Sequence, residues 1–368
     1  MLVSSRAWQH LHKYLKFIAL SLLAAAILFW FGRSLDWDSV SRALRQSDWR
    51  LILLAAAIIA VTYLVRAMRW RAFLLPLVPA GVSLRELFAA TTVGFGAVFL
   101  IGRTAEVVRP AFLPLRDSRV RPGVAFVTIA VERIYDMVAV ILLFAANLLF
   151  FRVPGGEAAN FARVRQAGLV MLVVAIAGVG GLLILRRHAA WITLRLNQWF
   201  NSKPPLIGRA GRLLTGLLTQ LAEALGVLVS ARELLTTVGW TALLWAAIMA
   251  ASLLVYRAFG LPVGLSETVF VLGWSLVGSL VPTPGGAAGT YHLATAAGLV
   301  FIGAVSTIEG AAAVAIVLHL VMFAPALVFA LYYFLRSDIS IARLRGLASS
   351  ESAVQQEVAD NSRPAASS

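Results

Sequence analysis

The chain has 368 residues, of which 60% are hydrophobic and 13% are charged, and its mean hydropathy is +0.85. These values exclude a soluble globular domain and indicate a polytopic membrane protein, and continuous rather than alternating apolar runs favour α-helices over a β-barrel. The net charge of +15 is assigned to topology determinants at the lipid surface rather than to nucleic-acid binding, and the absence of Cys excludes disulfides and thiol chemistry.

Six apolar runs are long enough to be spanning helices. In chain order they comprise residues 17–32, 51–65, 124–150, 168–185, 234–256 and 310–335. No small-residue cleavage site follows the first run, so we expect an uncleaved first span.

The runs also define the expected domains. Residues 1–16 are expected to form a cytoplasmic N-terminal segment and residues 17–336 a transmembrane domain, which includes an interfacial segment at 186–233. Residues 337–368 are rich in Ser, Ala and Gln, and we expect them to be a disordered cytoplasmic tail.

Two further apolar regions, residues 87–115 and 268–303, are interrupted by the motifs "GRTAEVVRP" and "VPTPGGAAG". Each is expected to form two half-helices joined at a break, because Pro breaks helices and Gly permits backbone conformations that other residues avoid. In the second region the helix is expected to resume near Thr290, which would put His292 in its first turn. A plain extramembrane turn is the alternative for this motif.

The distribution of basic residues predicts the topology. If the N-terminus is inside and each interrupted region returns to the side it entered from, the inside segments carry 21 Lys and Arg and the outside segments carry 8. This excess supports a topology with both termini inside. The two interrupted regions then enter from opposite sides, as in an inverted repeat. The predicted fold class is an all-α polytopic membrane protein with six spanning helices, two broken or re-entrant helical hairpins and an inverted repeat.

Two charged motifs, "GRTAEVVRP" and "VERIYD", lie within these apolar segments. Their six ionisable residues are Arg103, Glu106, Arg109, Glu132, Arg133 and Asp136. The first three share a broad helical face, and the last three lie ~15–20 Å along a span. An ionisable group there costs at least ~2.5–3.5 kcal/mol unless it has a partner or a water-filled cavity.

Three interpretations of these charges stay open. The two clusters can neutralise each other as a structural ion-pair network, or they can line a polar cavity in which Arg binds an anionic headgroup. Alternatively, the first motif is a hydrated cytoplasmic loop. The second span ends in residues expected to be interface anchors, with a headgroup relay as the alternative: Arg66, Arg69, Trp70 and Arg71.

The motifs "GRTAEVVRP", "VERIYD" and "VPTPGGAAGTYH", together with "RAMRWRAFL", resemble the flippase-like transmembrane region of lysylphosphatidylglycerol synthases over about residues 15–335. The resemblance implies lipid translocation and makes the six ionisable residues characteristic polar positions. It also marks the later break, for which our candidates are Pro284, Gly285, Gly286, Gly289 and His292.

The sequence departs from the family pattern in two places. Ile101 and Ala105 stand where Pro and Gly are usual, and His292 stands near a position where the family often has Glu. Nothing in this sequence corresponds to the cytosolic aminoacyl-transfer domain, so the resemblance does not imply lysine transfer.

We therefore expect a flippase-like protein of a bacterial or archaeal inner membrane that translocates an anionic phospholipid or polyprenyl-phosphate-linked lipid. We expect no catalytic residue, cofactor, metal or nucleic-acid partner, because no corresponding motif is present. The alternative is a membrane-embedded glycosyl or aminoacyl transferase with Glu106 or Asp136 as base, or the accessory subunit of a partner transferase. The sequence leaves the oligomeric state open.

Overall fold

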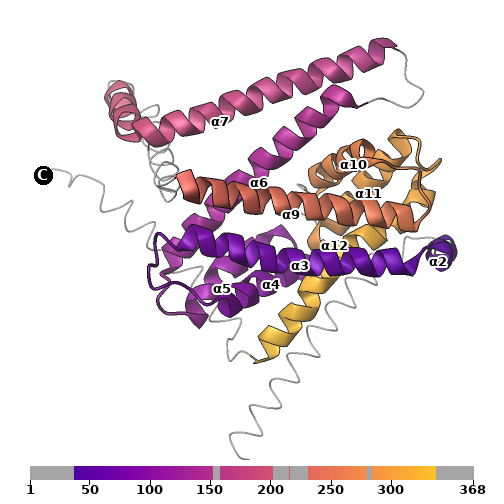
Figure 1. Cartoon of the computed structure of the whole chain (residues 1–368), viewed down its shortest axis with the longest axis horizontal. Coiled ribbons are helices and arrows are strands. Elements are labelled where there is room, and N and C mark those ends of the chain that lie inside the picture. The colour runs from indigo at the N-terminus through magenta and orange to yellow at the C-terminus, as the bar shows by residue number, and fades with distance from the viewer. Residues whose placement is uncertain (1–36, 152–157, 202–214, 216–230, 280–283, 337–368) are drawn as a thin grey trace, which may run out of the picture. The chain divides into compact units, whose positions relative to one another are not determined.

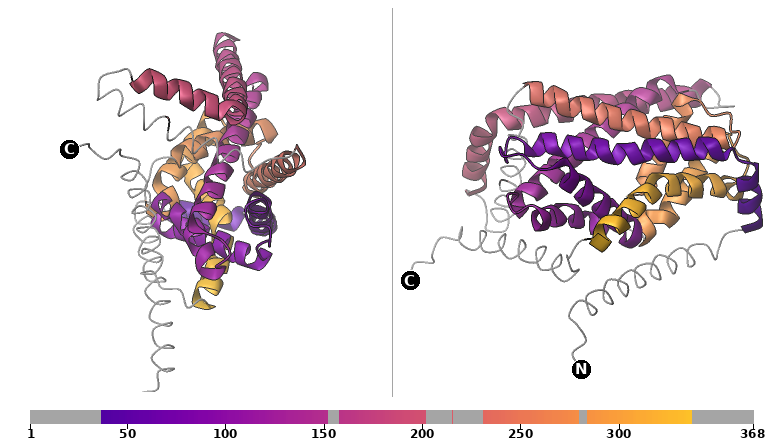
Figure 2. Two further views of the ribbon diagram at one scale, coloured as in Figure 1. Left: turned by 90° about the vertical axis from the view of Figure 1, so that its left-hand side faces the viewer. Right: turned by 60° about the horizontal axis from the view of Figure 1, so that its bottom comes forward.

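The computed structural model describes residues 37–151, 158–201, 215, 231–279 and 284–336. All regular elements in this part of the chain are helices (Figure 1, Figure 2). They are α2 (Trp37–Gln46), α3 (Trp49–Leu74), α4 (Leu84–Ile101), the 3-10 helix η1 (Arg103–Val107), α5 (Val108–Arg116), α6 (Pro122–Phe150), α7 (Ala158–Asn201), α9 (Ala231–Ala258), α10 (Leu265–Gly278), α11 (Pro284–Phe301) and α12 (Ile308–Arg336).

Three of the described helices are long and apolar enough to cross a membrane, namely Trp49–Leu74, Arg232–Ala258 and Gly310–Tyr333. They coincide with the second, fifth and sixth predicted spans, so the chain is a multi-pass membrane protein. The third predicted span lies in α6, which has 29 residues and three ionisable groups near its middle. The first predicted span and the predicted tail lie outside the described residues, and a total of six spans stays a prediction.

The predicted fourth span lies in the 44-residue helix α7. The helix continues past the expected boundary at residue 185 and kinks at His188, which has φ −121° and ψ 22°. The Leu-rich part of the predicted interfacial segment lies outside the described residues, so this domain boundary stays a prediction.

The chain divides into two compact units, which are described separately. Unit 1 consists of residues 1–68, 82–126 and 246–368, and unit 2 consists of residues 69–81 and 127–245. Unit 1 contains both interrupted regions and α12. Unit 2 contains the end of α3, most of α6, α7 and the beginning of α9.

The first interrupted region in unit 1 is a broken helical hairpin, which confirms the predicted break. Helix α4 ends at Gly102, whose φ of 93° lies in the region that favours glycine, and η1 and α5 lead the chain back. Arg116 at the end of α5 donates two hydrogen bonds to Glu86 near the start of α4. Near the middle, a Cβ added to Gly94 would lie 2.5 Å from the Cβ of Arg109. These pairings show that α4 and α5 run antiparallel.

The turn after α5 is held by an ion pair. Arg119 donates to the Asp117 carboxylate from its backbone N and from its Nε, over 3.1 and 2.8 Å. The hydrogen bonds from the Arg119 side chain hold the pKa of Asp117 below its usual range. This carboxylate therefore stays ionised and fixes the exit of the hairpin.

The second interrupted region in unit 1 is also an antiparallel hairpin, formed by α10 and α11. The hydroxyls of Ser275 and Thr295 are 2.7 Å apart, and the rings of Phe270 and Phe301 stack with centroids 5.3 Å apart. The predicted helix start near Thr290 is wrong, because α11 begins six residues earlier.

Pro284 is the first residue of α11, a position at which a missing N–H leaves no helical hydrogen bond unmade. Gly285 and Gly286 lie in the first turn of the helix rather than in the break, and His292 lies in the third turn rather than the first.

The two hairpins of unit 1 approach the middle of α12 from opposite ends. Near the start of α4, Phe88 packs on Phe329 near the end of α12, with centroids 5.1 Å apart. Near the end of α4, Phe99 packs on His319 in the middle of α12, at 5.6 Å. From the other hairpin, His292 contacts the same His319, and α11 continues into the start of α12 through a short turn. The end of α4 and the middle of α11 therefore lie at the central turns of α12.

Replacing Glu86 with Ala should lower the free energy of unfolding by about 1 kcal/mol, because Glu86 and Arg116 form a bidentate pair with side chains only 20% and 19% exposed. We expect an SDS titration of the purified protein to show the same loss for Arg116→Ala and no further loss for the double variant. The exchanged pair Glu86→Arg/Arg116→Glu should recover part of the stability. Losses that simply add in the double variant would contradict the pairing.

Candidate functional site

Unit 1 brings two guanidinium groups to one aromatic ring. The Cζ of Arg66, on α3, lies 4.6 Å from the ring centroid of Phe95, and that of Arg109, on α5, lies 6.0 Å from it. Arg109 is only 4% exposed. Gly94 precedes Phe95, and its missing Cβ lets α5 approach closely enough for Arg109 to reach the ring. The break in the hairpin and the small Gly94 thus place the buried guanidinium of Arg109 at the same ring as that of Arg66.

The same ring is tied to α12. Tyr63 packs edge-on against Phe95 with centroids 5.4 Å apart, and its hydroxyl donates to the carbonyl oxygen of Met322 over 2.7 Å. Phe95 and Phe99 are one turn apart on α4, and Phe99 contacts His319. Phe95, which both arginines contact, is therefore one helical turn along α4 from the Phe99 that contacts His319.

Two histidines meet at that point. The Nδ1 of His319 lies 2.8 Å from the Nε2 of His292. His319 is only 2% exposed, whereas His292 is half-buried. His292 thus packs on α12 through a hydrogen bond to a second imidazole.

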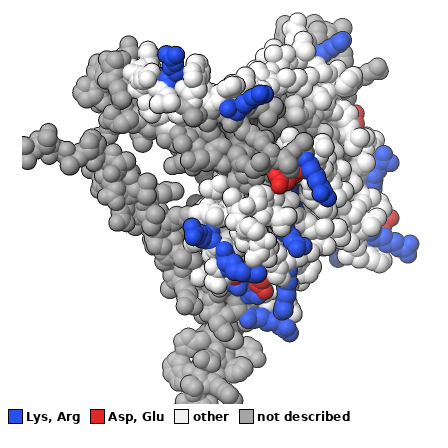
Figure 3. Space-filling model, turned by 60° about the vertical axis from the view of Figure 1, so that its left-hand side comes forward, with Lys and Arg blue, Asp and Glu red and all other residues white. Residues whose placement is uncertain are grey.

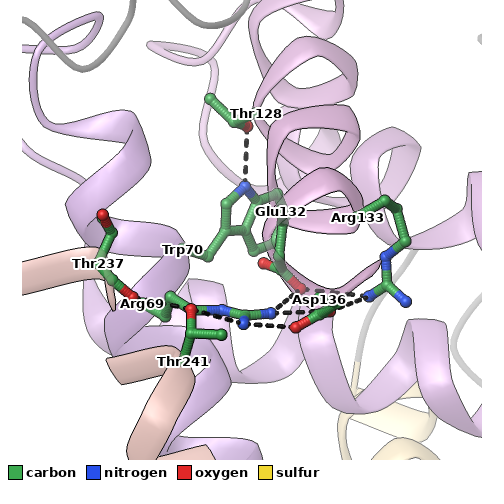
Figure 4. Close-up of polar contacts among 8 residues, drawn as sticks. All are labelled: Arg69, Trp70, Thr128, Glu132, Arg133, Asp136, Thr237 and Thr241. Carbon is green, nitrogen blue, oxygen red and sulfur yellow. Dashed lines mark hydrogen bonds and ion pairs between the residues drawn. The ribbon is translucent and has the colours of Figure 1, made fainter. Parts of the chain in front are cut away.

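Unit 2 contains a buried ion-pair network centred on Arg69 (Figure 4). Its NH1 and NH2 donate to the two carboxylate oxygens of Asp136 over 2.6 and 3.1 Å, and NH2 lies 2.9 Å from Oε1 of Glu132. NH1 also donates to Thr241 on α9 over 3.2 Å. Arg69 and Glu132 are fully buried, so the carboxylates on α6 are neutralised by a cation at the end of α3.

Arg133 completes this network from its more exposed side. Its NH2 lies 3.3 Å from Glu132 and 3.6 Å from Asp136, and its side chain is 41% exposed. Beside the network, the indole of Trp70 donates to Thr128 over 2.9 Å (Figure 4). Two arginines and two carboxylates give the cluster no formal net charge.

The structure changes the interpretation of the residues at the end of the second span. Arg69 and Trp70 are fully buried, so their assignment as interface anchors is wrong. Helix α3 continues to Leu74, and Arg71 is exposed as an anchor would be. Arg66 contacts Phe95 and belongs to the paired arginines of unit 1.

The predicted site residues fall into several places. Glu132, Arg133 and Asp136 come together in unit 2, and Arg109 lies buried in unit 1. Glu106 is exposed on η1, and the side chain of Arg103 lies outside the described residues.

The glycines of the second hairpin also differ from expectation. Gly289 is exposed, and a Cβ added there would meet nothing within 4 Å, so it permits no close approach. Gly278 does, because an added Cβ would lie 2.5 Å from both Ala294 Cβ and Thr290 O. The position of Gly278 at the end of an apolar run, four residues before the Pro-Gly motif, was a signal that sequence reasoning missed.

Charged side chains are sparse on the face drawn in Figure 3. Most of the described surface in that view is uncharged, and most of its coloured side chains are Lys or Arg. The assignment of the chain's basic residues to the lipid surface stays a prediction.

Comparison with known proteins confirms the resemblance inferred from the motifs. The family model described as the lysylphosphatidylglycerol synthase TM region matches residues 17–330. A curated relative, Glycosyltransferase AglD of Haloferax volcanii, is 25% identical over 332 residues, which cover 81% of this chain and 50% of that protein. The chain thus spans about half the length of the curated relative that it matches.

Proposed function

This chain belongs to the family of the lysylphosphatidylglycerol synthase TM region, and from that premise we propose that it is a flippase-like protein that moves an anionic lipid between leaflets. The lipid is a phospholipid or a polyprenyl-phosphate-linked lipid. In this proposal the protein lies in a bacterial or archaeal cell membrane with both termini inside, and it has six spanning helices and an inverted repeat. The opposite approach of the two hairpins to α12 supports the repeat.

The pair of guanidinium groups at Phe95 is the observation that carries this proposal. Both Arg66 and Arg109 lie within 6.0 Å of one ring centroid, so their guanidinium carbons can be no further apart than the two centroid distances added together. In the proposal, one phosphate group accepts hydrogen bonds from both, and the planar guanidinium matches phosphate better than an ammonium group does.

The position of the pair suits passage of a headgroup. Arg109 follows the break at Gly102, and the neighbouring Phe99 contacts the middle of α12. Broken helices that meet in the interior are the usual place for substrate sites in transporters with repeated halves. We propose that the headgroup passes Arg66 and Arg109 while the acyl or prenyl chains stay in the bilayer.

We propose a structural role for the network of unit 2. The fork of Arg69 is already used by Asp136 and Glu132, and the four charges balance. Of the described members, Arg133 is the one with a side chain exposed enough to meet a headgroup. Headgroup binding by Arg103, Glu106 and the first turn of α11 stays a prediction.

Lipid translocation by purified protein tests the proposal. In vesicles containing fluorescent phosphatidylglycerol, dithionite quenching reports how fast the lipid reaches the outer leaflet. Arg66→Gln and Arg109→Gln should each slow it by about tenfold or more, since a charge-assisted hydrogen bond contributes ~1.5–3 kcal/mol.

Arg71→Gln is the matched control, because Arg71 is an exposed arginine on the same helix as Arg66. It should translocate lipid at the wild-type rate. A wild-type rate in the double variant Arg66→Gln/Arg109→Gln would contradict this site.

The relative named as a glycosyltransferase favours a second candidate function, a membrane-embedded transferase or its accessory subunit. Incubation of the purified chain with a polyprenyl-phosphate-linked sugar and membrane acceptors distinguishes the two. Formation of a glycosylated product, with no change in lipid distribution between leaflets, would favour the transferase.

A further inference from the structure

The imidazoles of His292 and His319 in unit 1 form a hydrogen bond in which either ring can be the donor. His292 on α11 and His319 on α12 face each other with rings at 73° and centroids 4.8 Å apart. Because Nε2 of His292 and Nδ1 of His319 are 2.8 Å apart, one nitrogen carries the proton and the other supplies a lone pair. Exchange of these roles reverses the direction of the bond.

Each arrangement leaves one outer nitrogen as a donor and the other as an acceptor. If His319 donates through Nδ1, its Nε2 has a lone pair and the neutral His292 carries its proton on Nδ1. If His292 donates through Nε2, the assignments are reversed. A proton added at the outer acceptor gives an imidazolium hydrogen-bonded to an imidazole, so the pair can hold one added proton.

Aromatic rings surround His319, the more buried histidine of the pair. Phe99, Phe323 and Tyr291 lie 5.6, 5.0 and 4.8 Å from the ring of His319, measured between centroids. The buried Nε2 of His319 has no hydrogen-bond partner among the described residues. The outer nitrogen of His292, Nδ1, is buried as well, although the residue as a whole is half-buried.

The charged neighbours of the pair are the arginines of the candidate site. Among the described residues around it, the titratable and charged groups include Tyr291 on α11, Tyr256 on α9, which interacts electrostatically with Tyr291, Tyr63 on α3, and Arg66 and Arg109 at Phe95. Phe95 is one turn, about 5.4 Å along the helix, from the Phe99 that contacts His319. A proton on the pair thus adds positive charge in the same unit as the two arginines, from which the rings of Phe95 and Phe99 separate it.

We propose that His292 and His319 form a proton-binding site that couples headgroup movement to proton movement. The inference rests on the proposed function. An added proton raises the local positive charge and favours binding of an anionic headgroup at Arg66 and Arg109, and loss of the proton favours its release. One proton therefore binds and leaves with each headgroup, and no other co-reactant is needed.

The proton site itself can be tested without transport. The full chain has five His residues, so ring-¹⁵N-labelled protein in lipid nanodiscs gives few imidazole signals, which single substitutions assign. We expect a scalar coupling across the hydrogen bond between Nδ1 of His319 and Nε2 of His292. We also expect the pair to take up one proton before a second. Two imidazoles that titrate independently, with no coupling, would overturn the proposal.

The coupling is tested in vesicles with fluorescent phosphatidylglycerol and an imposed pH difference. The initial rate of wild-type translocation should differ at least severalfold between gradients of opposite direction. In His292→Gln/His319→Asn the amide groups replace the ε and δ nitrogens, so the hydrogen bond is kept and titration is lost. This variant should show equal rates in both gradients.

His188→Gln is the control, because His188 is an exposed histidine of α7 and its loss should leave the response to the gradient unchanged. Equal wild-type rates in both gradients would overturn the coupling. If the wild type moves no probe lipid at all, the proposed function fails and the coupling with it, while the nuclear magnetic resonance result still decides whether the pair binds a proton.

Discussion

Replacing Arg69 with Ala should lower the free energy of unfolding by ~3–5 kcal/mol, the largest loss of stability that we expect from one substitution. The change would leave the fully buried carboxylate of Glu132 and the nearly buried one of Asp136 without their main partner. An SDS titration of the purified protein measures the loss, and the amount of folded protein in membranes should fall with it.

Arg133→Ala is the matched control for this prediction. Arg133 contacts the same two carboxylates, but over 3.3 and 3.6 Å and with a side chain 41% exposed, so we expect a loss below about 1 kcal/mol. Combining Arg69→Ala with Glu132→Gln and Asp136→Asn should restore part of the stability. Equal losses of unfolding free energy for Arg69→Ala and Arg133→Ala would contradict the prediction that the buried arginine contributes more to stability than the exposed one.

Local chemistry explains which parts of the fold could be predicted. The breaks in both interrupted regions follow from Gly and Pro, whose backbone preferences act over a few residues, and both regions are hairpins. The start of α11 was misplaced because Pro284 was read as a helix breaker, although proline is favoured in the first turn of a helix. Proline is favoured in the first turn of a helix and disfavoured in its middle, and local sequence does not distinguish these two positions.

The site depends more on tertiary contacts, and its prediction was correspondingly incomplete. The chemistry of Glu132 and Asp136 indicated that they need cations, but their shared partner is Arg69, which lies 67 residues before Asp136. One signal was available, because Ile59, Thr62, Arg69 and Phe73 recur at helical spacing and all are buried. The approach of Arg66 and Arg109 to the same ring depends on the packing of α4, and no spacing in the sequence predicts it.

The histidine pair shows how a departure from a family pattern acquires meaning from structure. His292 stands where the family often has a carboxylate nearby, and sequence alone left its role open. Its contact with His319 places near that position a group that can be neutral or positive. Such a group is compatible with the anion site proposed at Arg66 and Arg109, because a fixed carboxylate nearby would oppose the binding of a phosphate.

We expect the second large effect at Gly278. Whether a substitution there lowers or raises the free energy of unfolding tests how closely α10 and α11 pack. Gly278→Ala should lower the free energy of unfolding by ~1–3 kcal/mol, because the new Cβ would lie 2.5 Å from both the backbone oxygen of Thr290 and the Cβ of Ala294. Neither atom is at the end of a flexible side chain, so α10 and α11 would have to separate.

Gly289→Ala is the comparison within the same hairpin. Its Cβ would meet nothing within 4 Å, and Ala is favoured over Gly inside a helix by ~1 kcal/mol, so this variant should be slightly more stable than the wild type. Unfolding in SDS measures the change in the free energy of unfolding for both variants. Translocation of fluorescent phosphatidylglycerol should fall only for Gly278→Ala, because separation of α10 from α11 also displaces His292. If Gly278→Ala stabilises the protein as Gly289→Ala does, then α10 and α11 do not approach as closely as described, and the hairpin cannot hold His292 against α12.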